Sequence, residues 1–442
     1  MLSGAEHLAR KSIYMIRSYG WRGFFQRIRR SLMRKLLRQA RWEKAYSVET
    51  FRLATSFDCT PAEVQQSQRV MAAHVGRLDV ATITWFLPHF EHAFYGGIFT
   101  ILRFAAGFAE RWGVRNTFVV LSDGGRTSAA SYREQIQAAF PQLIPSNLIV
   151  HHPWDNIAAL PAADMCIATH WTTAFTALRY NQTKRKCYFV QDFEPMFFPA
   201  GSTSAQAEAT YRFGFYGIAN TRTLKQIYSQ QFQGTATYFD PCIDTSLFYP
   251  PLTRTGDKPP TPATVFFYAR PDYWRNGFEL GANALRQLKK RMGARVRIIS
   301  AGQQWSPREY GLEGVIENLG LLTYHETAAL YRTCDVGLTM MFTRHPSYLP
   351  FEFMASGCMV VSNISDATSW LLQDGENCLL TLPIAGCIAD TLARALEDHA
   401  LRYRIVNNAL AMIREHYTDW DRQIEKVYRF LGDPDSSTQE FA

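Results

Sequence analysis

The sequence lacks several features that would define the class of a protein at once. No apolar run approaches the ~18 residues that a membrane-spanning helix needs, and the first thirty residues lack the uninterrupted apolar segment of a signal peptide. The eight cysteines form no C-x-x-C pair, which removes the spacing signature of zinc ribbons and redox dithiols. Charged residues make up only 19 % of the chain, which excludes a charge-swollen disordered protein. We therefore expect a globular protein of two or three domains that stays in the cytoplasm.

The net charge of +8 is concentrated in the first 45 residues, which hold twelve Lys and Arg against two Glu. Apolar and aromatic residues interleave with these charges at near-helical spacing, as in helices that lie on an anionic lipid surface. Residues 1–50 are therefore expected to form a basic amphipathic segment that anchors the protein peripherally on the inner face of the cell membrane. A basic helix docked on the same chain and a nucleic-acid arm are the alternatives. The second is disfavoured because the rest of the chain has no basic face or binding motif.

From residue 78 onward, short β-rich runs alternate with longer helical periods, a rhythm typical of parallel sheets covered by helices. The alternation predicts an α/β protein with two doubly wound, Rossmann-like domains, at 76–249 and 263–415, joined by a proline-rich linker at 250–262. Residues 416–432 are expected to form a C-terminal helix, followed by a disordered tail at 433–442. The predicted strands are 78–87, 116–122, 147–150, 164–168, 186–191, 215–219, 263–270, 295–300, 334–341 and 358–363, and the clearest predicted helices are 97–113, 221–232 and 277–292.

Capping-box spacing predicts four helix starts in this pattern. The pairs are Ser131 with Glu134, Thr203 with Gln206, Asn276 with Glu279, and Thr323 with Glu326. Two doubly wound domains form a cleft between the carboxyl ends of their strands, and such folds bind ligands there. Candidate functional residues are therefore those that directly follow a predicted strand.

In the first half, three strand ends carry candidate residues. Gly96 and Gly97 follow the first strand and precede a helix, so backbone N–H groups could approach a ligand there. His170 follows the fourth strand and could donate to a sugar hydroxyl or act as a base. Asp192 and Glu194 follow the fifth strand, and such carboxylates could accept hydrogen bonds from carbohydrate hydroxyls or remove a proton. A structural role remains open for each of them.

In the second half, Arg270 ends a strand and Arg275 stands before the next helix. Two guanidinium groups beside a helix start suit a diphosphate, because they neutralise two negative charges without a metal ion. Glu352 lies in a short helix and could hydrogen-bond a ribose hydroxyl. The neighbouring N–H groups, around Ser347 and Tyr348, could hold phosphate. The Asp419-Trp420-Asp421 triplet sits in the terminal helix rather than after a strand, so we expect no metal site there.

This constellation resembles the GT-B glycosyltransferases, and within them the retaining nucleotide-sugar transferases of family four. The resemblance spans about residues 80–432. The matching motifs are Gly96-Gly97, His170-Trp171, Asp244 and Phe248 of PCIDTSLFYP, Ala269-Arg270 with Arg275-Asn276, Glu352-Phe353-Met354-Ala355-Ser356-Gly357, and WLLQDGENCLL at 370–380. The resemblance implies a GT-B fold and a nucleotide diphosphate sugar as donor. Backbone groups of the stretch 320–323, which includes Leu321, are expected to face the nucleotide base.

One departure concerns the donor sugar, because the family's first glutamate, eight residues before Glu352, would fall on Arg344. The segments FVQDFEP, YARPDYWRN and HPSYLPFE are similar to the subgroup typified by the rhamnosyltransferase WsaF. That similarity implies dTDP-rhamnose as donor, a lipid-linked surface polysaccharide such as O-antigen as acceptor and product, and no cofactor. A retaining reaction is favoured over an inverting one, for which Asp192 would be the base. A nucleotide-sugar 2-epimerase and an inactive sugar-nucleotide-binding scaffold are the alternatives.

Overall fold

The computed structural model describes Val48 and residues 51–94, 96–122, 124, 127–144, 146–251 and 262–437. The basic segment 1–50 apart from Val48, the linker residues 252–261 and the tail residues 438–442 lie outside these described residues. The chain divides into two compact units, and the larger one, Asp58–Pro307 with the residues from Leu312 onward, holds both sheets. In the smaller unit, residues 51–56 are helical. No helix within the described ranges is both long and apolar enough to cross a bilayer.

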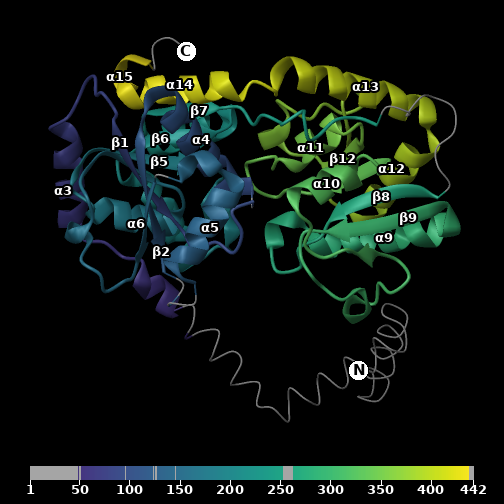
Figure 1. Cartoon of the computed structure of the whole chain (residues 1–442). Coiled ribbons are helices and arrows are strands. Elements are labelled where there is room, and N and C mark those ends of the chain that lie inside the picture. Colours follow the sequence, from purple (N-terminus) through teal and green to yellow (C-terminus); the bar gives the residue numbers. More distant parts are fainter. Residues whose placement is uncertain are drawn as a thin grey trace, which may run out of the picture. The chain divides into compact units, whose positions relative to one another are not determined.

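The first lobe is a seven-stranded parallel sheet covered by helices (Figure 1). Its strand order is β3-β2-β1-β4-β5-β6-β7, so the order reverses between β1 and β4, where doubly wound sheets bind their ligands. The strands are β1 (Thr82–Leu87), β2 (Arg115–Leu121), β3 (Asn147–His151), β4 (Ala163–Ala168), β5 (Thr183–Val190), β6 (Tyr216–Asn220) and β7 (Ala236–Phe239). The helices are α3 (Pro61–Ala72), α4 (Gly96–Trp112), α5 (Ala129–Ala139), α6 (Trp171–Arg179), α7 (Ser202–Ala209) and α8 (Arg222–Phe232).

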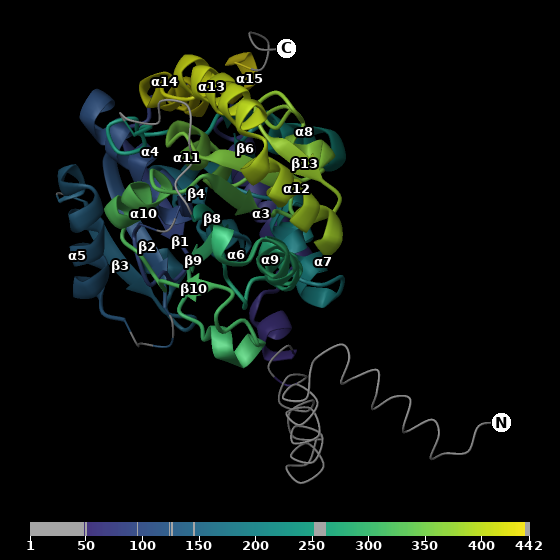
Figure 2. The same cartoon turned by 90° about the vertical axis from the view of Figure 1, so that its right-hand side faces the viewer.

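The second lobe repeats this plan with six parallel strands in the order β10-β9-β8-β11-β12-β13, and Figure 2 brings its elements to the front. The strands are β8 (Ala263–Tyr268), β9 (Val296–Ala301), β10 (Glu317–Asn318), β11 (Val336–Thr339), β12 (Met359–Asn363) and β13 (Leu379–Thr381). The helices are α9 (Phe278–Met292), α10 (Tyr324–Tyr331), α11 (Leu349–Ala355), α12 (Ala385–Glu397) and α13 (His399–His416). The predicted α/β class with two doubly wound sheets is confirmed.

Three strands were not expected from the sequence, namely β7, β10 and β13. Each stands at the edge of its sheet and has only two to four residues. Runs this short show no alternation that could be told from a loop. The ten predicted strands are all present, and their bounds shift by a few residues.

The predicted capping boxes have mixed outcomes. The box at the start of α10 is confirmed: Thr323 Oγ1 accepts from the Glu326 N–H at 3.2 Å, and the Glu326 carboxylate accepts from the Thr323 N–H at 2.8 Å. The prediction for Ser131 is wrong, because α5 begins three residues earlier. Its N-cap is Ser128, whose hydroxyl accepts from the Ser131 N–H at 3.2 Å.

The remaining two caps are also wrong. Helix α7 begins at Ser202 after Gly201, without a side-chain cap, so Thr203 lies inside the helix. Helix α9 begins after Gly277, whose left-handed φ of 59° ends the short 3₁₀ turn that contains Asn276. A Cβ at Gly277 would lie 2.6 Å from Cε2 of Phe342, so both the backbone and the packing require glycine.

The predicted C-terminal helix is shorter than expected. Helix α13 ends at His416, and α14 (Trp420–Gly432) begins after Asp419, whose side chain accepts from the Arg422 N–H at 2.9 Å. The apolar face of α14 completes the core of the first lobe rather than that of the second. The expected disordered tail is in part helical, since Pro434–Ser437 forms α15.

A buried arginine fixes the end of α14 to the first sheet. Arg185 in β5 is 1 % exposed, and its Nη1 donates to the Leu431 carbonyl at 2.6 Å. Its Nη2 donates to the carbonyl of Gly76 at 2.5 Å, and the guanidinium lies over the ring of Tyr216. One cation thus binds carbonyl groups from both chain segments that flank the first lobe.

We expect Arg185→Ala to lower the free energy of unfolding by about 3 kcal/mol, because buried carbonyl groups lose a charged donor. Urea denaturation would measure this loss. Arg69→Ala, at an exposed position of α3, is the matched control and should change stability by less than about 0.5 kcal/mol. Equal losses of stability in the two variants would contradict the role of Arg185 in holding the end of α14 on the first sheet.

Candidate functional site

A cavity of about 570 Å³ lies at the carboxyl edge of the second sheet, and residues of both lobes line it. We call it the cleft pocket. Its lining residues are His92, Phe94 and Gly96 from the first lobe and Phe266, Tyr268, Ala301, Gly302, Leu321, Leu322, Thr323, Tyr324, His325, Thr327, Tyr331, Ser347, Tyr348, Leu349 and Glu352 from the second. Five predicted site residues belong to this set, namely Gly96, Leu321, Ser347, Tyr348 and Glu352.

The predicted glycine pair begins α4 at the first-lobe side of the pocket. Gly96 lines the cleft pocket, and a Cβ there would lie 3.8 Å from Cδ2 of Tyr348. Gly97 is not part of the lining. A Cβ at Gly97 would lie 3.2 Å from the side-chain nitrogen of Gln191, so its small size matters for packing beside the strand end of β5.

The loops after β9 and β10 form the opposite side of the pocket. Gly302 has a φ of 118°, and its N–H donates to the carbonyl of Gly320 at 2.9 Å. A Cβ at Gly302 would lie 2.6 Å from Cε2 of Tyr268, which explains why a glycine stands here. Leu321, which follows directly, is 50 % exposed and lines the pocket. The stretch expected to face a base therefore does border the cavity.

Glu352 is a buried carboxyl group of the pocket wall. It is 8 % exposed, and among the described residues no side chain or backbone group donates a hydrogen bond to it. Burial raises its pKa to about 8. Ionised carboxylates are rarely buried unpaired, so this group needs either a proton or a ligand donor at neutral pH. A ribose hydroxyl could supply that donor.

The two predicted arginines lie beside each other next to the pocket, without lining it. Arg270 Nη1 is 3.4 Å from the hydroxyl of Tyr268, a lining residue, and its guanidinium carbon is 3.5 Å from the ring centre of Tyr273. The Arg275 guanidinium is 4.3 Å from the ring centre of Phe197, which belongs to the first lobe. Burial lowers the pKa of Arg275, the charge of Asp192 opposes this, and the charge of Arg270 adds to it.

His170 is the N-cap of α6. Its Nδ1 lies 2.8 Å from the Thr172 hydroxyl and accepts from the Thr172 N–H at 3.4 Å. Burial, together with the charge of Arg275, lowers the pKa of His170 to about 4. The imidazole is therefore neutral at physiological pH and offers one N–H donor.

Asp192 connects the two lobes. Its Oδ1 accepts from the Phe193 N–H at 2.7 Å, and its Oδ2 accepts from the Thr343 hydroxyl of the second lobe at 2.8 Å. Burial raises the pKa of Asp192 to about 6, while the Thr343 hydrogen bond and the charge of Arg275 oppose the shift. Because both oxygens already accept hydrogen bonds, the arrangement favours a role in joining the lobes over the predicted role of base.

Glu194 lies inside the first lobe and is not among the lining residues of the cleft pocket, and its role in substrate binding stays a prediction. The side chain is 2 % exposed, and Oε2 accepts from the Trp171 N–H at 2.5 Å and from the Tyr188 hydroxyl at 3.1 Å. Burial raises its pKa to about 8. The carboxyl group therefore stabilises the first turn of α6 beside His170 and is closed off from the cleft pocket.

The sequence analysis missed His345 and Thr343, which lie between β11 and α11. His345 is 5 % exposed, and its Nδ1 accepts from the Ser347 N–H at 2.9 Å. Ser347 has a φ of 67°, unusual for a residue with a side chain, and the imidazole holds it there. A polar residue two positions before such a turn is the signal that could have identified His345.

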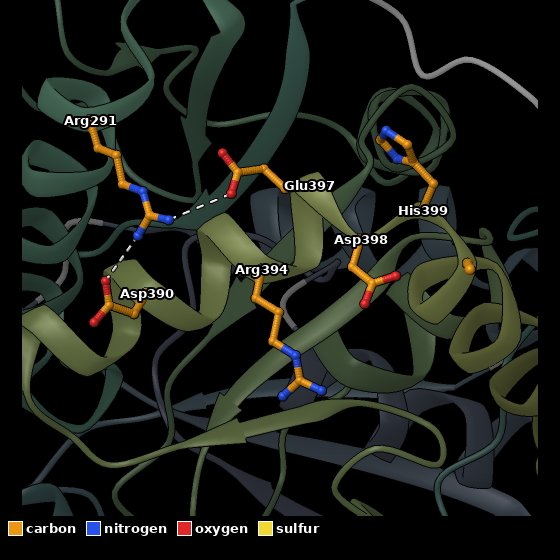
Figure 3. A pocket seen from close by; sticks show the side chains of 7 residues that line it. Arg291, Asp390, Arg394, Glu397, Asp398 and His399 are labelled. Atoms are coloured by element: carbon orange, nitrogen blue, oxygen red, sulfur yellow. Dashed lines mark hydrogen bonds and ion pairs between the residues drawn. The ribbon is translucent and has the colours of Figure 1, made fainter.

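A second, more open hollow lies on α9 and α12 of the second lobe (Figure 3). Arg291 pairs there with Asp390 at 3.1 Å and with Glu397 at 3.5 Å. Figure 3 shows the Arg394 side chain directed away from this pair. The lining holds two arginines against three carboxyl groups, so this hollow offers no excess positive charge to a diphosphate.

We expect Glu352→Gln to raise the melting temperature by about 2–4 °C at pH 8.5 and to leave it unchanged at pH 5. The raised pKa means that the folded protein holds a proton that the unfolded chain releases. The stability from this group is therefore complete below pH ~4.5 and is lost as the pH rises through about 8. Glutamine stays neutral throughout. Exposed Glu279→Gln is the control, and a pH-independent difference between Glu352→Gln and the native protein would contradict the assignment.

Family models place the chain in a known group. The N-terminal domain of WsaF matches residues 91–223, and the C-terminal domain of WsaF matches residues 263–393. The O-antigen biosynthesis protein RfbC of Myxococcus xanthus is 41 % identical over 382 residues, which is 85 % of this chain and 29 % of that protein. The chain thus spans less than a third of that relative.

Solved structures share the fold at low sequence identity. HepE of Anabaena, in complex with UDP and glucose, has a TM-score of 0.61 at 16 % identity, covering 79 % of this chain and 99 % of that one. WaaG, a glycosyltransferase involved in lipopolysaccharide biosynthesis, has a TM-score of 0.53 at 13 % identity, covering 78 % and 98 %. Together with the two domain matches, which follow one another across both lobes, these likenesses show that the chain belongs to the WsaF family of GT-B glycosyltransferases.

Proposed function

We propose that this protein transfers L-rhamnose from dTDP-rhamnose to a growing, lipid-linked surface polysaccharide of the O-antigen type. The observation that carries the proposal is the buried carboxyl group of Glu352 in the cleft pocket, to which no group among the described residues donates a hydrogen bond, with Arg270 beside the lining residue Tyr268. The O-antigen role of RfbC, the lipopolysaccharide role of WaaG and the UDP and glucose bound to HepE support a nucleotide-sugar donor and a polysaccharide product.

In this proposal, Glu352 accepts a hydrogen bond from the donor ribose, and the base lies against the stretch that contains Leu321. The Arg270 and Arg275 guanidinium groups bind the diphosphate. Their charges stabilise it increasingly as the bond between sugar and phosphate breaks, which is the condition for lowering the barrier. Two fixed cations then perform the task that a divalent metal performs in other phosphate sites.

The acceptor hydroxyl attacks from the face that the diphosphate leaves, and a phosphate oxygen takes its proton. The neutral imidazole of His170 hydrogen-bonds a hydroxyl of the sugar and orients it. This retaining course is supported by the contacts of Asp192, whose two oxygens each already accept one hydrogen bond, from Phe193 and from Thr343. A reaction that retains the anomeric configuration of the sugar is thus favoured over an inverting one, for which Asp192 would be the base.

The test is a panel of donors, namely dTDP-rhamnose, dTDP-glucose, UDP-glucose and GDP-mannose, followed by transfer to polysaccharide. A ligand at 100 times its Kd stabilises the fold by ~2.7 kcal/mol, so dTDP-rhamnose should give the largest thermal shift. Arg270→Ala and Glu352→Ala should each lower kcat/KM for transfer by at least about 30-fold, equivalent to ~2–3 kcal/mol. NMR of the product reads the anomeric configuration.

Arg394→Ala, in the outer hollow on α12, is the matched control and should retain full activity. Unchanged kcat/KM in folded Arg270→Ala and Glu352→Ala would reject their roles. A larger thermal shift with another sugar nucleotide would reject rhamnose as the donor sugar. Epimerised donor in the absence of any acceptor would reject transfer as the reaction.

We further propose that residues 1–45 hold the protein on the inner face of the membrane, where a lipid-linked acceptor is found. Their twelve basic residues and interleaved apolar residues support attraction to anionic lipid. Deleting residues 1–45 should abolish co-sedimentation with phosphatidylglycerol vesicles and raise KM for a lipid-linked acceptor while KM for the donor stays constant. Undiminished vesicle binding after the deletion would refute the anchor.

A further inference from the structure

The segment that joins β11 to α11 is tied to the first lobe at two points. Near its start, the Thr343 hydroxyl donates to Asp192 at 2.8 Å. At its end, the hydroxyl of Tyr348 is hydrogen-bonded to Oγ1 of Thr100 in α4, at 3.1 Å. Both contacts cross from one lobe to the other. The segment therefore couples the position of α11, which carries Glu352, to the first lobe.

Tyr348 makes this coupling through both its side chain and its backbone. Its ring lies against Gly96, where a Cβ would be 3.8 Å from Cδ2. Thr100, which bonds the tyrosine hydroxyl, is also 2.7 Å from the Gly96 carbonyl. The carbonyl of Tyr348 accepts from the N–H of Glu352 at 3.0 Å. One residue thus touches the start of α4 and the backbone of the pocket glutamate.

Two strained residues flank the contact. Ser347, with a φ of 67°, directly precedes Tyr348 and is held by His345. On the first-lobe side, the side chain of Asn220 lies close to the Tyr348 hydroxyl, and the next residue, Thr221, has a φ of 110°. Positive φ values are unfavourable for residues with side chains, above all for a β-branched one. Such conformations persist only where the surroundings fix them, and each of these two residues is a chain neighbour of a residue at the contact.

We propose that Thr100 and Tyr348 form a positioning pair that sets Glu352 and the nucleotide against the first lobe in the reactive arrangement. The inference rests on the proposed glycosyl transfer and adds residues that do not themselves react. Most of the pocket lining comes from the second lobe, so loss of the pair leaves nucleotide affinity nearly intact. It misplaces the donor relative to Gly96 and His170, and the rate of transfer falls.

The test is a double-mutant cycle with Thr100→Val and Tyr348→Phe, both of which keep the shape of the side chain. Each variant should lower kcat about 10-fold and change the Kd for dTDP, measured by calorimetry, less than about 2-fold. The double variant should lower kcat by about 10–20-fold rather than 100-fold, because the two residues act through one contact. Thr100→Ser, which keeps the hydroxyl, should retain near-native kcat.

Matched controls are Thr391→Val in α12, whose hydroxyl bonds the Cys387 carbonyl of its own helix, and Tyr403→Phe, which is 61 % exposed in α13. Neither should change kcat. Hydrogen exchange of residues 343–355 in ligand-free protein should increase equally in Thr100→Val and Tyr348→Phe. A loss of kcat of about 100-fold in the double variant, or unchanged hydrogen exchange in the single variants, would contradict the proposed positioning pair. If exchange responds as expected but the native protein transfers no sugar, the proposed function fails and the contact between the lobes stands.

Discussion

The removal of three carboxyl groups from water is the constraint on which the centre of this structure depends. Asp192, Glu194 and Glu352 are each at most 8 % exposed, and burial raises the pKa of every one of them. A buried carboxylate is tolerated only when donors replace its hydration. Glu194 receives such donors from its own lobe and Asp192 receives one from the other lobe. Only Glu352 is left without them among the described residues.

The presence or absence of hydrogen-bond donors distinguishes these three carboxyl groups better than their positions after predicted strands do. Glu194 stabilises the start of α6 and thereby the orientation of His170, and Asp192 joins the lobes through Thr343. Both are satisfied before any ligand arrives. No group among the described residues donates to Glu352, so a bound hydroxyl could be its donor, and ligand binding and relief of its desolvation would then act in the same direction.

The sequence predicted the two sheets because long, strongly apolar strands such as β1 and β8 dominate them. The short helix with its apolar neighbours predicts Glu352 at the site, and the resemblance to the GT-B glycosyltransferases implies that the stretch with Leu321 faces the base. The sequence could not distinguish an open carboxylate from an enclosed one, since the donors of Glu194 and Asp192 come from Trp171 and Thr343, distant in the chain. Edge strands of two to four residues, and helix starts that tertiary contacts shift, likewise leave no local pattern.

Helix α14 has a consequence for how the chain acquires its structure. Its apolar side chains fill the core of the first lobe, and Arg185 in β5 binds the carbonyl of Leu431, some 246 positions away. Contacts of such sequence separation form late, because a large loop must close first. During synthesis, the first sheet therefore emerges from the ribosome long before the segment that covers it. The nascent N-terminal half has to keep an apolar surface from aggregating until the last helix arrives.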